Sequence, residues 1–227
     1  MNVLQIAQRA SLLLDLERPT ALFASTDRTM LEFADTVNVA AQQIMDDYDW
    51  SALIRTATVT GTGAQTAFPL PDDFSRMVRD ASLLGVTLQW YPAQQMQDYN
   101  RWLELETYTD LQTWDQRWMV FGGQLNLRPA LPNAEVLRYG YITKNIVNGA
   151  DPTMFTADTD TWLLDDELLR LSIVWNWKQA KGFDFQAELA KYAEQLEKLR
   201  FRDVGSRQTI ISGRGYGRRW PTGQAFP

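Results

Sequence analysis

The spacing of apolar residues changes twice along the 227-residue chain, and this change constrains the fold more than any other feature. Between residues 31 and 48, apolar residues recur every three or four positions, which is the period of an amphipathic helix. Residues 53–60 read LIRTATVT, and such β-branched residues favour strands. Helical spacing returns between residues 165 and 202. The sequence therefore predicts a mixed α+β protein with helices from both ends of the chain and a β-rich region between them.

The N- and C-terminal helices are expected to form one helical bundle from residues 1–49 and 160–202. A short first helix must end before Pro19, because a proline ring does not fit inside a helix. Longer helices are expected over residues 27–48, 165–181 and 184–202 and should pack together. The helix at 165–181 is apolar over more than half of its circumference, which predicts burial on several sides.

Residues 50–159 are expected to form a β-rich domain inserted between the helices. Besides 53–60, strands are expected at 77–88, 118–121, 124–128 and 135–143, with Gly122-Gly123 as a hairpin turn. The sequence Phe-Pro-Leu-Pro at 68–71 predicts an extended turn, because proline lacks the donor that a central strand needs. Residues 93–104 have helical spacing, so one helix is expected inside this domain.

Residues 203–227 have no helical period and predict an extended C-terminal arm that becomes ordered on a partner. Residues 200–227 contain six arginines and one aspartate. The rest of the chain, with 16 basic and 27 acidic residues, then has a net charge of −11. An acidic body with a basic arm is suited to an acidic partner. Trp220 and Phe226 are candidates to anchor the arm in a groove of a neighbouring protein.

The chain contains no histidine and no cysteine. Disulfides, thiolate zinc sites, iron–sulfur clusters, cysteine nucleophiles and Ser-His-Asp triads are therefore excluded. Only carboxylate catalysis, or a divalent cation held by Asp and Glu, would remain for an enzyme. We predict no catalytic residue, no resident metal and no cofactor, and expect the chain to bind or build rather than to catalyse.

Three acidic clusters are the remaining candidates for a metal or catalytic site. They are Asp46-Asp47 with Asp49, Asp72-Asp73, and Asp165-Asp166-Glu167. The first could bind a divalent cation, and the third could cap the helix that follows it. Helix capping and solvation are the preferred interpretation of all three.

Besides Trp220 in the arm, the chain has eight tryptophans, which fall into two groups. Trp50, Trp162, Trp175 and Trp177 lie within or beside predicted helices and are expected in the core. The other group lies in the β-rich region. For these four residues, a role as an exposed aromatic platform that stacks on sugar rings remains an open interpretation: Trp90, Trp102, Trp114 and Trp118.

No run approaches about 20 consecutive apolar residues, so no membrane-spanning segment is expected. The N-terminal sequence also has no basic leader before an apolar run, as a secretion signal would. We expect the protein to stay in the cytoplasm at least while it folds.

The order of these parts resembles that of the head-to-tail adaptor proteins of tailed bacteriophages, also called head completion proteins or portal connectors. A helical region ends in DDYDWSALIRTATVTGTGAQTAFPLPDDFSRM at 46–77, and a β-rich middle, a helical hairpin and a Gly/Arg-rich arm follow. The segments most similar to this family are Trp50 with the strand at 53–60, Leu-Pro-Asp-Asp-Phe at 70–74, and residues 163–181.

The resemblance implies a structural virion protein at the head–tail interface, assembled in the host cytoplasm. It implies a homo-oligomeric ring, generally a dodecamer, which docks under the portal protein, extends the DNA channel and receives the next tail or nozzle protein. Packaged DNA would pass through the lumen during ejection without sequence-specific binding, which an acidic body favours. The β-rich middle would face outward or toward the tail. In this family the C-terminal segment grips the portal, which implies a portal-binding role for Arg207, Arg214, Tyr216, Arg218, Arg219, Trp220 and Phe226.

Two other functions stay open. One is a carbohydrate-binding or glycan-hydrolysing phage tail module, which would use the tryptophans of the β-rich middle. The other is a nucleic-acid-binding accessory protein, because residues 213–220 interleave arginine, glycine and aromatic side chains.

Overall fold

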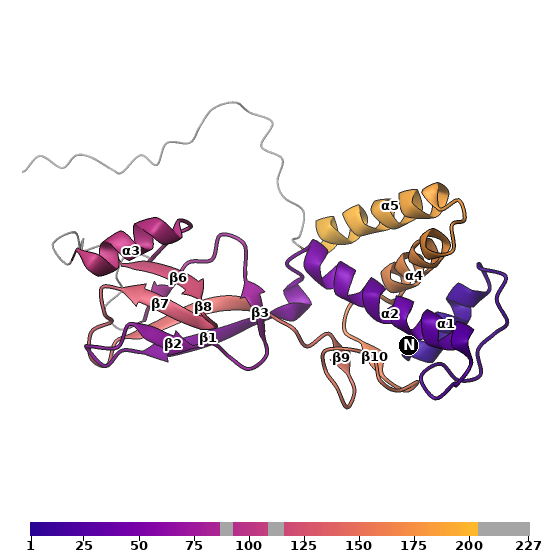
Figure 1. Ribbon diagram of the computed structural model, residues 1–227, viewed down its shortest axis with the longest axis horizontal. Coiled ribbons are helices and arrows are strands. Elements are labelled where there is room, and N and C mark those ends of the chain that lie inside the picture. The colour runs from indigo at the N-terminus through magenta and orange to yellow at the C-terminus, as the bar shows by residue number, and fades with distance from the viewer. Residues whose placement is uncertain (87–92, 109–115, 204–227) are drawn as a thin grey trace, which may run out of the picture.

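The computed structural model describes residues 1–86, 93–108 and 116–203, which form two lobes joined end to end (Figure 1). These residues contain five α-helices and ten short strands in three sheets, so the protein is mixed α+β as expected. One lobe is mainly helical and the other is β-rich. Each lobe has its own apolar core.

The helical lobe contains α1 (Val3–Ser11), α2 (Arg28–Asp47), α4 (Asp166–Ala180) and α5 (Gln186–Asp203). Local sequence explains where two of these helices begin. Asn2 caps α1 in a capping box with Gln5, and the Asp165 side chain accepts a hydrogen bond of 2.8 Å from the Leu168 amide at the start of α4. The helices predicted at 27–48, 165–181 and 184–202 are thereby confirmed to within two residues at each end.

The expected helical bundle is wrong as a description of this lobe. α1, α2 and α5 each pack against α4, which lies at the centre, instead of forming a bundle of mutually packed helices. A small sheet of β9 (Val147–Asn148) and β10 (Thr161–Trp162) completes the lobe. The core is therefore shared between helices and non-helical residues, among them Ile146, Val147, Phe155 and Trp162.

Of these non-helical residues, Ile146, Val147 and Phe155 fall between 50 and 159, the range expected to form the inserted domain. Trp50 and Leu53 also belong to the core of the helical lobe. Trp50 precedes the short 3-10 helix η1 (Ser51–Leu53) and Leu53 is its last residue, and through η1 the chain enters the β-rich lobe. The division into 1–49 with 160–202, 50–159 and 203–227 remains a prediction.

The β-rich lobe contains two four-stranded sheets. In the first, β1 (Ile54–Thr60), β8 (Val136–Thr143) and β3 (Phe74–Met77) are neighbours in that order, and β4 (Leu84–Gly85) also pairs with β8. All of these pairs are antiparallel, with Ile54 opposite Ile142 at one end of the β1–β8 pair and Thr60 opposite Val136 at the other. The strands predicted at 53–60 and 135–143 are confirmed.

The second sheet has the order β2 (Ala67–Pro69), β7 (Gln124–Arg128), β6 (Arg117–Phe121) and β5 (Gln94–Gln95). Gly122 and Gly123 have φ values of 60° and 72° and join β6 to β7, as the hairpin prediction requires. Phe68 and Pro69 were expected in a turn but belong to β2. This strand lies at the sheet edge, where a missing proline donor is tolerated.

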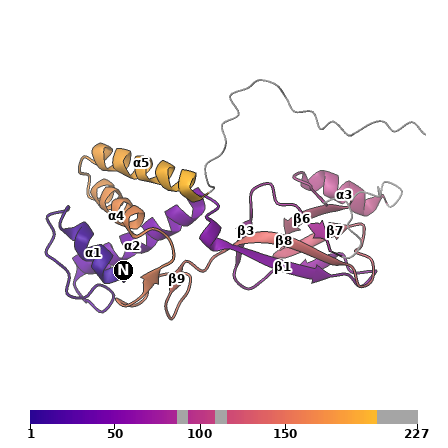
Figure 2. The same ribbon diagram turned by 180° about the vertical axis from the view of Figure 1, so that it is seen from behind.

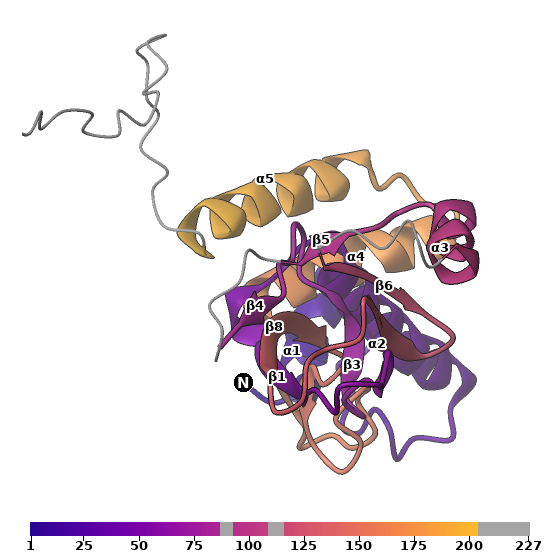
Figure 3. The ribbon, with the colours of Figure 1, turned by 90° about the vertical axis from the view of Figure 1, so that its left-hand side faces the viewer.

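Two other expectations for this lobe are corrected. The helix predicted at 93–104 is α3 (Tyr99–Thr107), because Gln94 and Gln95 pair with β6 instead. The strand predicted at 77–88 is split: β3 ends at Met77, and only Leu84–Gly85 form β4 within the described part of that range. Figure 3, which views the molecule from the end of the β-rich lobe, shows α3 on the outside of this lobe.

Candidate docking region at the junction of the lobes

The two lobes meet where α2 ends, and the last turn of α2 contains Asp46 and Asp47 but no basic residue. The free carbonyls at a helix C-terminus carry partial negative charge, so two carboxylates are unfavourable there. Cationic side chains from distant parts of the chain must compensate for them. In the structure these side chains come from β3 and α5.

Arg76, on β3, closes the end of α2 from the side of the β-rich lobe. Its guanidinium donates to the carbonyl oxygens of Met45 at 3.2 Å and Tyr48 at 3.0 Å, and it forms an ion pair with Asp49. The other carboxylate oxygen of Asp49 accepts a hydrogen bond of 2.6 Å from the Arg79 amide. Burial alone would raise the pKa of Asp49. The ion pair with Arg76 and the hydrogen bond from the Arg79 amide outweigh this effect, so the pKa of Asp49 lies below its ordinary value. This contact ties the two lobes together.

Helix α5 contacts the end of α2 from within the helical lobe. Arg200 donates to the Asp47 carbonyl at 3.0 Å and lies over the ring of Tyr48, with its guanidinium carbon 5.6 Å from the ring centre. The Tyr192 hydroxyl donates to the Asp47 carboxylate at 2.8 Å. Burial, and then the hydrogen bond to Asp47, raise the pKa of Tyr192 far above its ordinary value.

The last described residue, Asp203, is also the last residue of α5. Its carboxylate accepts hydrogen bonds from the amide and the hydroxyl of Ser51, at the start of η1. A groove of about 280 Å³ lies beside it and is lined largely by apolar side chains: Trp50, Ala52, Leu163, Leu164 and Leu199, with Asp165, Arg202 and Asp203 at its rim. The polypeptide beyond Asp203 therefore starts from a fixed point at the junction of the lobes.

The portal-binding residues predicted on the arm lie outside the described residues, so the structure does not place them. They are Arg207, Arg214, Tyr216, Arg218, Arg219, Trp220 and Phe226. The roles of Arg76 and Arg200, which bind the carbonyls at the end of α2, were not identified from the sequence. The acidic residues at the end of a predicted helix were the available signal, since they require cations from elsewhere.

The three acidic clusters serve structural contacts. Asp73 accepts hydrogen bonds from the Tyr141 hydroxyl at 2.7 Å and the Thr143 hydroxyl at 2.8 Å, which lower the pKa of Asp73 although burial opposes them. Burial and this hydrogen bond raise the pKa of Tyr141 to about 12. Asp165 caps α4, and Glu167 pairs with Arg170. Among the described residues, no group of three or more acidic side chains could hold a metal ion.

Most of the described tryptophans are buried. Trp50, Trp162 and Trp177 are in the core of the helical lobe as expected, and Trp175 is partly buried against it. Trp118 is fully buried on β6, and its indole nitrogen donates to the Ala93 carbonyl at 3.0 Å. Trp102 is also buried, 5.7 Å from the ring of Phe121. Neither offers a ring face to a sugar, whereas Trp90 and Trp114 lie outside the described residues.

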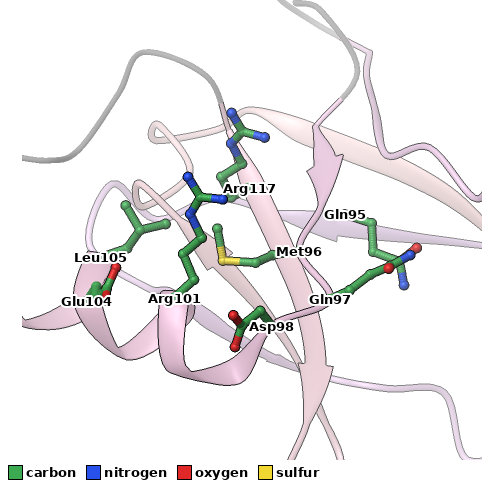
Figure 4. Close-up of a pocket in the computed structure, with 8 residues that line it drawn as sticks. All are labelled: Gln95, Met96, Gln97, Asp98, Arg101, Glu104, Leu105 and Arg117. Carbon is green, nitrogen blue, oxygen red and sulfur yellow. The ribbon is translucent and has the colours of Figure 1, made fainter.

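Two larger hollows lie away from the junction. At the far end of the helical lobe, Leu13, Leu14, Leu16, Trp177 and Phe183 line a groove of about 640 Å³. In the β-rich lobe, a pocket of about 590 Å³ lies between α3 and the β5–β6 edge. Figure 4 shows Arg101 and Arg117 extending on the same side of Met96, with Asp98 at the N-cap of α3 and Glu104 on the helix. Because the pocket contains both basic and acidic side chains, it favours neither an anionic nor a cationic ligand.

No helix in the described part of the chain is both long and apolar enough to cross a lipid bilayer. Comparison with curated proteins gives no match. Comparison with protein families does: the model of the family described as SU10 adaptor protein matches residues 1–219.

Proposed function

Because this chain belongs to the SU10 adaptor protein family, a family of phage head-to-tail adaptors, we propose that it forms a ring under the portal. The ring extends the DNA channel and docks the next tail or nozzle protein. The observation that carries this proposal is the extent of the family match, which covers both lobes and most of the arm. Membership makes the chain a structural phage protein of the virion, which argues against an enzymatic role.

The arm is the proposed portal-binding element. It begins at the junction of the lobes, where Ser51 holds Asp203. Residues 204–227 contain four arginines and no acidic residue, together with Tyr216, Trp220 and Phe226. At ~3.3 Å per extended residue, these 24 residues could reach ~80 Å from Asp203. Arginine and aromatic side chains are also the types enriched at the energetic centres of protein interfaces.

The acidic body suits the wall of a DNA channel. Residues 1–203 contain 18 basic and 28 acidic residues, a net charge of −10. A lining of this sign repels phosphate groups, whereas a basic lining would retain DNA through salt-dependent contacts. The β-rich lobe is proposed to face the tail, and folding before docking is proposed to take place in the host cytoplasm.

Truncation after Asp203 tests the role of the arm. The shortened chain keeps the Asp203–Ser51 hydrogen bonds, so we expect a folded protein with an unchanged Tm that no longer forms rings on purified portal complexes. The measurement is electron microscopy of the mixture. The control is full-length protein carrying Gln208→Ala and Thr209→Ala, which keeps the basic and aromatic residues of the arm. Rings of truncated protein on the portal would remove the arm from the mechanism.

A further inference from the structure

Helix α5 has one side in contact with the body and one side that no other described residue covers. Tyr192, Leu196 and Leu199 face α4 and are buried. The opposite side, called here the α5 outer face, is exposed and consists of Ala187, Ala190, Lys191, Glu194, Glu197, Lys198, Phe201 and Arg202. Phe201 has 71% of its surface exposed and lies half a turn away from the buried residues. A phenylalanine this exposed, among alanines, indicates a contact surface.

Helix α2 has a second such surface on a different side of the lobe. Leu31, Asp35, Val39 and Asp46 recur along its exposed side, and Leu31 and Val39 are 52% and 43% exposed. Met154 is exposed beside them. It is held there because Asn38 donates to the Phe155 carbonyl at 3.2 Å and Gln42 donates to the Thr153 carbonyl at 2.9 Å. These five residues are called here the α2 outer face.

The two faces have opposite charge. Asp35 and Asp46 on the α2 outer face make no ion pair or side-chain hydrogen bond with the described part of the chain. The same is true of the three basic residues on the α5 outer face, Lys191, Lys198 and Arg202. The acidic residues of the α5 outer face are Glu194 and Glu197, of which Glu197 pairs with Arg200, so the net charge of this face is +1, against −2 on the α2 outer face.

Their placement allows both faces to be occupied at once. α4 lies between α2 and α5 and packs against both, and the two views of the ribbon agree on this (Figures 1 and 2). A closed ring needs a heterologous contact, in which one surface of each copy meets a different surface of the next. A chain with two exposed, apolar and oppositely charged faces on separate helices meets this requirement.

We propose that, in the ring, the α2 outer face of each copy binds the α5 outer face of its neighbour. Phe201 packs against Leu31, Val39 and Met154, and Lys191, Lys198 and Arg202 face Asp35 and Asp46. This inference rests on the proposed ring and names the surfaces that build it. Because the arm starts directly after α5, the contact also fixes the base of each arm relative to the next copy.

Cross-linking tests which surfaces meet, and the absence of native cysteine makes it selective. The variant Val39→Cys, Phe201→Cys is assembled on purified portal complexes and treated with a short bis-maleimide. Each copy carries both cysteines, so a heterologous contact should give a ladder from dimers up to the full ring on a denaturing gel. The matched control is Leu103→Cys, Phe201→Cys, because Leu103 is exposed on α3 in the other lobe. It should give no ladder.

The outcomes separate this inference from the proposed function. Rings in the micrographs with a ladder only in the Val39 variant support it. Rings without that ladder, or with products that stop at dimers, overturn the proposed surfaces and leave the ring intact. No rings of the unmodified full-length protein on the portal would overturn the proposed function and this inference together.

Charge reversal gives a second test. One variant carries Asp35→Lys and Asp46→Lys, and the other carries Lys191→Asp and Lys198→Asp. Each alone should weaken ring assembly by about tenfold or more, because like charges then face each other. Mixing the two variants should restore rings, since alternating copies present opposite charges at every contact. Failure of the mixture to recover, with both variants folded by circular dichroism, would overturn the pairing.

Discussion

Single side chains from distant parts of the sequence complete the C-terminus of α2. The Trp50 indole donates to the Ile44 carbonyl at 2.7 Å, and Arg76 and Arg200 bind the carbonyls of Met45, Tyr48 and Asp47. Buried carbonyls without donors would cost stability, so these contacts allow the helix to end inside the junction. The geometry of the junction therefore depends on a few polar side chains.

Replacing Asp49 by Asn should destabilise the protein by about 1–3 kcal/mol at pH 7, because Arg76 loses its carboxylate partner in a partly buried site. An aspartate in an unfolded chain has a pKa of about 4. The folded-state pKa of Asp49 lies below that value. The stabilisation is therefore complete above that value and is lost as the pH falls through the folded-state pKa. Urea denaturation at several pH values measures the difference between the two proteins, which should shrink at low pH.

The control for this prediction is Asp72→Asn. Asp72 is exposed and makes no side-chain hydrogen bond with the described residues, so its replacement should change the free energy of unfolding by less than about 0.5 kcal/mol. An Asp49 variant that behaved like this control at pH 7 would show that the Arg76 contact adds nothing to stability.

Helix α4 organises the helical lobe at the level of elements. Its side chains contact α1, α2 and α5, and Leu168, Leu169, Ile173, Val174 and Trp177 are all buried. The ring of Phe33 on α2 meets Trp177 edge to face, with the ring centres 5.2 Å apart. The lobe therefore depends on one helix that is covered on three sides.

Truncating Ile173 to alanine should cost about 2–5 kcal/mol, because the side chain is fully buried and the surrounding helices cannot close the space completely. Gln179→Ala, at an exposed position of the same helix, is the matched control and should stay within about 0.5 kcal/mol of the original protein. Chemical denaturation measures both. Equal effects of the two substitutions would contradict the central position of α4.

The whole molecule separates its charges: an acidic body of net charge −10 and an arm of four arginines. This distribution predicts that any affinity of the free subunit for DNA resides in the arm. Full-length protein should bind duplex DNA weakly, with a slope of log K against log salt no steeper than about −3.6 for four phosphate contacts. The chain truncated after Asp203 should show no binding in the same fluorescence anisotropy titration.

Binding of DNA by the truncated chain at physiological salt would contradict the proposed passive channel wall. It would favour the alternative of a nucleic-acid-binding protein, since the body would then present a cationic surface that its composition conceals.

Features that depend on neighbours in sequence could be predicted from the sequence. The bounds of α2, α4 and α5, the Gly122-Gly123 hairpin and the mixed α+β class follow from hydrophobic period and turn chemistry, which act over a few residues. The charge of the body and of the arm is also a property of the sequence alone. The candidate arm residues were identified in this way, and they remain a prediction.

The tertiary structure decided which distant residues meet. Arg76 and Asp49 are 27 positions apart and Tyr192 and Asp47 are 145 apart, so no local period relates them. The same holds for the packing of three helices on α4 in place of a bundle, and for the burial of Trp118 under residues of two sheets. Periodicity shows which side of an element is apolar. Which other element covers that side depends on how all the elements of the chain pack together into one core.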